Sequence, residues 1–165
     1  MSGSVGSMNA DLMKSFLTHL VSMMNIDGGS TRVAVVTYSS TVGPCIKLNE
    51  YSTVASLQSA ISLLPYSPES QYSNTAAAFE YVRTWVLIAS EGDRIAVPNV
   101  VVLLTAGQST DIAATQVCLK HLAWAIKMCH FVFDRLFLVD IYNFCNNQHM
   151  KEHSTKALAK FTTSP

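Results

Sequence analysis

The stretch that decides the fold is Thr-Arg-Val-Ala-Val-Val-Thr-Tyr-Ser, at residues 31–39. It is rich in β-branched residues and almost wholly apolar, which favours a strand that is covered on both faces. The run Val-Val-Leu-Leu at residues 101–104 has the same character. We therefore expect two buried strands, over residues 32–38 and 97–105.

Helical patterns alternate with these strands along the chain. Apolar residues recur at three- and four-residue spacing from Met8 to Met23, which predicts a first helix. The same reasoning predicts helices over residues 54–63, 75–90 and 113–127, and further strands over residues 41–49 and 131–139. The alternation predicts an α/β fold, a Rossmann-like, doubly wound and mainly parallel sheet flanked by helices.

Length and composition limit the classes of protein and partner. The chain has 165 residues, which favours one domain, over residues 1–142, followed by a polar tail over residues 143–165. Its net charge is zero, so it has no basic field that would attract nucleic acid or anionic lipid. Its apolar runs are too short for membrane insertion, and residues 1–30 show no signal-peptide pattern.

The spacing of the cysteines and histidines leaves open both the redox state of the cysteines and a possible zinc site. The four cysteines follow no C-x-x-C pattern, so they can be reduced or paired. Cys145, His149 and His153 would share one face of a helix, a spacing that can seat zinc. The alternative is a polar tail that happens to hold these three residues.

Three loops lie where an α/β sheet binds ligands, beyond the carboxyl ends of its strands. They are residues 2–7, 69–75 and 105–110. The first reads Ser-Gly-Ser-Val-Gly-Ser and directly precedes the first helix, so its hydroxyls and N–H groups can bind an anion or a metal-held acid. A flexible N-terminus with a helix cap is the alternative.

Four segments, in order, resemble the von Willebrand factor type A domain and its metal-ion-dependent adhesion site. Ser2 and Ser4 match the two serines of the family's first motif, and residues 31–39 resemble its second strand. Ser73 stands at the position of a ligand threonine, and residues 103–109 resemble the strand that ends in Thr-Asp-Gly. The resemblance covers roughly residues 1–117.

The resemblance implies a secreted, non-catalytic module for protein adhesion or matrix assembly. Its partner would be an extracellular protein or matrix component. Candidate metal ligands are Ser2, Ser4 and Ser73, and candidate partner-binding residues are these three with Thr75 and Gln108. They belong to the loops at residues 2–7, 73–75 and 105–109.

The chain departs from the family pattern at both carboxylate positions. The first aspartate of the motif would precede Met1, and the second position is Ala106. Because Mg²⁺ needs anionic oxygens to offset its dehydration, we expect no bound cofactor and weakened or lost metal-dependent binding. Asp111 is either a substitute carboxylate or a helix N-terminal residue.

The same comparison predicts that the family's first central strand is missing. We interpret the chain as a fragment or an incomplete gene model, or one in which residues 131–139 partly fill the gap. A different class of function is a small-ligand or nucleotide-binding α/β enzyme that uses the Ser/Gly loop. Against it, the loop has no G-x-S-x-G elbow around Ser4 and no P-loop lysine.

Overall fold

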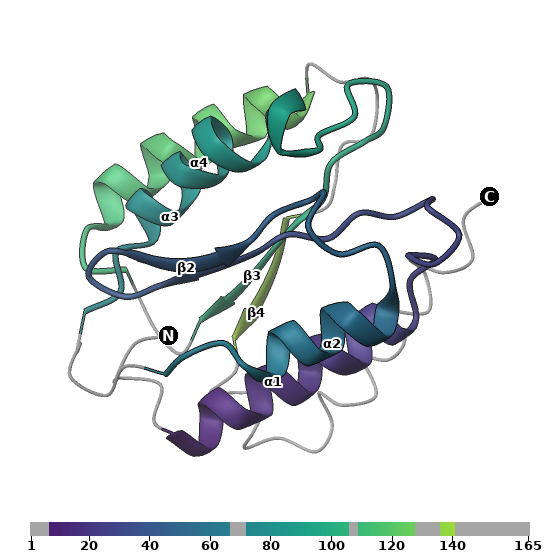
Figure 1. The fold of residues 1–165 in the computed structure, drawn as a ribbon. Helices are drawn as coiled ribbons and strands as arrows, with labels where there is room; N and C mark the ends of the chain where they lie inside the picture. Colours follow the sequence, from purple (N-terminus) through teal and green to yellow (C-terminus); the bar gives the residue numbers. More distant parts are fainter. Residues whose placement is uncertain (1–6, 67–71, 106–108, 128–135, 141–165) are drawn as a thin grey trace.

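The computed structural model describes residues 7–66, 72–105, 109–127 and 136–140 (Figure 1). Helices and strands alternate through this part of the chain. The α-helices are α1 (Ser7–Ser22), α2 (Val54–Ser62), α3 (Thr75–Tyr81) and α4 (Ile112–Lys127). The strands are β1 (Val35–Tyr38), β2 (Val42–Ile46), β3 (Val101–Thr105) and β4 (Leu136–Asp140).

The elements form three layers, with the strands in the middle. Figure 1 shows α1 and α2 together on one side of the strands and α3 and α4 together on the other. This arrangement confirms the predicted α/β class, with helices flanking both faces. The four predicted helices begin within two residues of the expected positions, because the apolar spacing follows the buried face of each helix.

The main core lies between the α1–α2 layer and the first two strands. Leu57 and Ile61 of α2 are fully buried, and the hydroxyl of Thr53 caps this helix by accepting from the Ser56 N–H over 3.3 Å. Burial of these side chains is the main source of helix stability. The buried residues of this cluster are Val21, Ile26, Ile46, Leu57, Ile61 and Leu64.

The described strands form two separate pairs. β1 and β2 are antiparallel, with Val35 opposite Ile46, and β3 and β4 are parallel, with Val101 opposite Leu136. Of the expected mainly parallel sheet, only the β3–β4 pair is therefore parallel in the described chain. The last apolar run pairs with β3, and its described part forms no ladder with β1. The described strands form no ladder between β1 and β3.

The helix predicted over residues 75–90 changes type before it ends. After α3, the chain forms the π-helix η2 (Val82–Val86) and then the short 3-10 helix η3 (Ala89–Glu91). The Leu87 N–H donates to the Val82 carbonyl over 2.9 Å, and the Thr84 hydroxyl donates to the Glu80 carbonyl over 2.7 Å. Such side-chain bonding to the preceding turn bends helices, which apolar spacing alone does not reveal.

The predicted tail over residues 143–165 and the first part of the strand predicted over residues 131–139 lie outside the described residues. Among the helices that the structure does describe, none combines the length and apolar character that a bilayer crossing requires.

Candidate functional site

Residues 73–75 bridge the ends of β1 and β3. The Asn74 N–H donates to the carbonyl of Ser39, just past β1, over 2.7 Å. The N–H of Thr110, beyond β3, donates to the Ser73 carbonyl over 2.9 Å, and the Ser73 N–H donates to the Thr110 hydroxyl over 3.1 Å. The carboxyl ends of both strands therefore meet at one segment, at the edge where α/β sheets bind ligands.

Ser109 is the centre of a hydroxyl cluster at this edge. Its Oγ donates to the Ser73 carbonyl over 3.1 Å and accepts from the Thr75 N–H over 3.3 Å. The Thr115 hydroxyl, in the first turn of α4, lies 2.8 Å from the same Oγ. One side chain thus links the loop after β3 to the starts of α3 and α4.

The local sequence explains why α3 begins here. The Asn74 Oδ1 accepts from the Ala77 N–H over 3.0 Å, which satisfies one of the free donors of the first turn. Thr75 is only 3% exposed, and its hydroxyl donates to the Tyr38 Oη over 3.4 Å. The structure therefore places Thr75, a predicted binding residue, in the interior, where its hydrogen bonds support the loop. Its contact with a partner stays a prediction.

Ser73 and Tyr72 form the accessible part of the segment. Ser73 is half-buried, and its Oγ has no hydrogen-bond partner among the described residues. Tyr72 stands beside it with 62% of its surface exposed. A free hydroxyl and an exposed aromatic ring are groups that a protein partner can contact.

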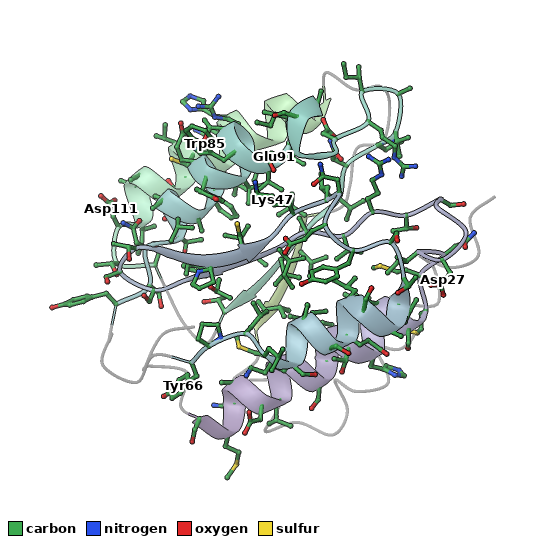
Figure 2. All side chains as sticks on the ribbon, in the orientation of Figure 1. Asp27, Lys47, Tyr66, Trp85, Glu91 and Asp111 are labelled. Atoms are coloured by element: carbon green, nitrogen blue, oxygen red, sulfur yellow. The ribbon has the colours of Figure 1, made fainter. Side chains whose placement is uncertain are left out.

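Asp111 directly precedes α4 and caps its first turn. Its Oδ1 accepts from the Ala114 N–H over 2.8 Å, and the side chain is exposed. Figure 2 shows Asp111 at the end of the helical layer where α4 starts. Of the two roles that the sequence left open, the structure shows the helix N-terminal one.

The described residues of this edge offer Mg²⁺ mainly neutral oxygens. Ser73, Thr75 and Ser109 supply hydroxyls, and the carboxylate of Asp111 accepts a hydrogen bond from the first turn of α4 through Oδ1. Mg²⁺ requires hard oxygens that include anionic ones. Within the described ranges, no three His, Cys, Asp or Glu side chains gather as a metal site would require.

Several predicted site residues lie outside the described residues. They are Ser2, Ser4 and Gln108 of the site itself, with Ala106 and the possible zinc ligands Cys145, His149 and His153. Their positions relative to Ser73 therefore stay predictions.

Sequence reasoning did not single out Ser109 or Thr115. Ser109 lies in the predicted ligand loop at residues 105–110, so a hydroxyl just after a buried strand was a usable signal. Thr115 falls inside a predicted helix, and its role depends on how α4 is placed against α3.

A second polar cluster lies on β2 and the helices beside it. Lys47 Nζ is 2.8 Å from Glu91 Oε2, and this hydrogen bond raises the pKa of Lys47; Figure 2 shows the two side chains beside each other. The Tyr81 hydroxyl is 3.3 Å from the Cys45 Sγ, and this hydrogen bond raises the pKa of Tyr81. These contacts link β2 and the residue after it to the helical layer that contains α3.

Solved structures share this architecture. Two solved structures of proximal thread matrix protein 1 from the mussel byssus match with TM-scores of 0.69, over 76% of this chain and 33% of theirs. Their sequences are 23% and 22% identical to this one, so the likeness shows the fold alone. The second of them has zinc in its metal-ion-dependent adhesion site.

Sequence relatives include proteins of the extracellular matrix. The mouse collagen alpha-4(VI) chain is 33% identical over 112 residues, and mouse matrilin-1 is 31% identical over 113 residues. Each match covers 67% of this chain but only 5% and 22% of the respective relative, so the chain spans a small part of both.

The match to a family model is longer than the resemblance traced through the motifs. The model of the von Willebrand factor type A domain matches residues 1–132, beyond the limit near residue 117 that the motifs suggested. This match covers most of the chain and agrees with the layered α/β architecture. The chain therefore belongs to the von Willebrand factor type A domain family.

Proposed function

We propose that this chain is a non-catalytic module for protein adhesion or assembly in the extracellular matrix. Its partner is an extracellular protein or matrix component, bound at the edge where β1 and β3 end. Family membership supports the proposal, as do relatives that include a collagen chain and a matrilin. The proposed surface consists of Tyr72, Ser73 and Ser109, together with Ser2, Ser4 and Gln108, and the buried Thr75 supports it.

One observation carries the proposal. Hydrogen bonds of Ser109 and Asn74 fix the backbone of residues 73–75, while Tyr72 and the Ser73 hydroxyl stay accessible. A rigid segment that presents an aromatic ring loses little conformational entropy on binding. Such a surface suits recognition of another protein.

The hydroxyls of this edge are poor candidates for nucleophiles. In the part of the chain that the structure describes, the hydroxyls of Ser109, Thr110 and Thr115 bond to backbone groups or to one another. A serine or threonine nucleophile needs a side-chain base within reach. This pattern supports binding over catalysis.

We propose further that binding does not require a divalent cation. In an adhesion site of this type, the metal presents positive charge to an acidic group of the partner. Here Ala106 stands at one carboxylate position and the carboxylate of Asp111 caps α4, so hydroxyls make up most of the oxygens that this edge offers a metal. Recognition then depends on hydrogen bonds and on the exposed ring of Tyr72.

Biolayer interferometry of the purified chain against immobilised type I collagen, type VI collagen and fibronectin tests the proposal. We expect saturable binding to at least one of them, equal in Mg²⁺ and in EDTA. Tyr72→Ala should weaken that binding about tenfold, because a truncated aromatic anchor typically costs more than 1 kcal/mol.

Trp85→Ala is the matched control for this substitution. Trp85 is equally exposed, at 63%, but lies about 15 Å along the helix from Thr75. Figure 2 shows it on the outer side of the helical layer, apart from Asp111. Binding that Trp85→Ala weakens and Tyr72→Ala spares would place the interface elsewhere, and absence of binding to all three proteins would count against an adhesion role.

A further inference from the structure

The turn between α1 and β1 contains Asp27 followed by Gly28, the one Asp-Gly pair of the sequence, which has no Asn-Gly pair. Both residues are exposed. Gly29 comes next with a φ of 73°, and no atom lies within 4 Å of the position that a side chain would take there. The tip of this turn therefore has room for its backbone to rearrange.

An Asp-Gly pair can rearrange without an enzyme, because glycine has no side chain that hinders attack by its nitrogen. The glycine nitrogen forms a bond to the carboxyl carbon of the aspartic acid, and the carboxyl hydroxyl leaves as water with the amide proton. Water then opens the cyclic imide. Opening at the main-chain carbonyl gives isoaspartate, in which the chain runs through the side-chain carbon and the mass is unchanged.

Two hydrogen bonds hold the groups that would react. The Gly28 N–H donates to the Asn25 Oδ1 over 3.1 Å, so its proton is directed at Asn25. The Asp27 Oδ1 accepts from the Val54 N–H over 3.0 Å, which holds the carboxyl towards α2. Because the reacting atoms must approach each other in an aligned geometry, both bonds oppose the reaction in the folded chain.

We infer that Asp27 is a site of spontaneous isoaspartate formation, and that the side chain of Asn25 sets the rate of this modification in the folded chain. Exposure and the open position at Gly29 permit the reaction. The bond from Gly28 to Asn25 slows it. The reaction requires no partner and does not involve the edge where β1 and β3 end.

The modification reaches the core through α2. The Val54 N–H is one of the free donors of the first turn of α2, and Asp27 satisfies it. Figure 2 shows Asp27 at the end of the α1–α2 layer where α2 starts. Ile26, directly before Asp27, is only 2% exposed and belongs to the main core. Isoaspartate lengthens the main chain by one carbon beside Ile26 and moves the carboxylate away from Val54.

Ageing of the full 165-residue chain at body temperature for several weeks tests the inference. Trypsin releases residues 15–32 as one peptide, in which electron-transfer dissociation distinguishes isoaspartate from aspartate. We expect isoaspartate to accumulate at Asp27. Asp111 is the internal control, because it is also exposed but precedes the bulky Ile112. No isoaspartate at Asp27, or equal amounts at Asp111, would overturn the inference.

Three variants test the role of Asn25. Asn25→Ala should speed the reaction about fivefold, the factor that corresponds to an ordinary hydrogen bond. Ser30→Ala should leave the rate unchanged, since it removes only the partner of the Asn25 Nδ2, 3.1 Å away, and leaves the bond from Gly28. Asp27→Glu should abolish the modification, because its imide needs a larger ring that forms slowly.

The same measurement in concentrated urea separates structure from sequence. The natural chain and Asn25→Ala should react equally fast there, because the bond to Gly28 exists only in the folded state. A difference that persists in urea, or equal rates of Asn25→Ala and Ser30→Ala in the folded state, would contradict the role of Asn25. The fully modified chain should melt about 3 °C lower. An unchanged melting temperature would contradict the effect on α2.

Discussion

Ser109 shows how one side chain can organise the candidate site. Its hydroxyl contacts the Ser73 carbonyl, the Thr75 N–H and the Thr115 hydroxyl, so it links the loop after β3 to the segment at residues 73–75 and to α4. Removing the hydroxyl leaves a partly buried N–H without its partner. Unsatisfied donors of this kind typically cost more than the bond itself contributed.

Ser109→Ala should therefore lower the free energy of unfolding by about 1–3 kcal/mol. Ser59→Ala is the control, because Ser59 is exposed and its hydroxyl donates only to the Ala55 carbonyl of its own helix, over 2.9 Å. That control should be neutral or slightly stabilising, since alanine favours helices. Urea denaturation of both variants measures the difference, and equal stabilities would show that the Ser109 contacts do not hold the site together.

The ion pair of Glu80 and Arg83 predicts a small loss of folding stability at acidic pH. The hydrogen bond from Arg83 holds the pKa of Glu80 below its usual value of 4.5. Because the folded pKa is lower than the unfolded one, the stabilisation is present above pH 4.5 and is lost as the pH falls through the folded value. Both side chains are partly exposed, so the effect is screened by solvent.

Glu80→Gln should lower the stability slightly at neutral pH and leave it nearly unchanged at pH 3, so that its loss of stability below pH 4.5 is shallower. Thermal unfolding of both proteins between pH 7 and pH 3 tests this. Parallel curves over the whole range would show that the pair contributes nothing to the pH dependence.

Individual elements differ in how well the sequence predicted them. α2 agrees with its predicted range closely, because Leu57 and Ile61 repeat at helical spacing and Thr53 is a good N-cap. The helix predicted over residues 75–90 agrees less well with the structure. Its second half is the π-helix at Val82–Val86, where the Thr84 hydroxyl bonds to the backbone, a feature that apolar spacing does not predict. Strand β1 is shorter than its apolar run, because Val33 and Ala34 precede Val35, the first residue that pairs with β2.

Two leucines, one within α2 and one at its end, test which face of this helix is buried in the core. Leu57 is fully buried, whereas Leu63, at the end of the same helix, is 82% exposed. Leu57→Ala should lower the free energy of unfolding by about 2–5 kcal/mol, because it leaves a cavity. Leu63→Ala should change it by less than about 0.5 kcal/mol. Urea denaturation distinguishes them, and similar costs would mean that α2 buries a different face.

The whole molecule combines a predictable architecture with a site that the sequence only outlined. The alternation of apolar strands and amphipathic helices predicted the α/β class, and the four motif segments predicted the family. Ser73 was placed correctly at the edge where β1 and β3 end, since that position follows from the order of the elements. The Ser109 cluster and the interior position of Thr75 were not predicted, because they depend on side-chain packing between distant loops.

The central proposal about the whole molecule is that this edge binds its partner without a divalent cation. Differential scanning fluorimetry of the chain during titration with MgCl₂ or MnCl₂, followed by EDTA, tests it most directly. A metal that binds only the folded state raises its melting temperature by mass action. Our account predicts no saturable rise with either metal. A saturable rise that EDTA reverses would contradict it and show that the site still holds a cation.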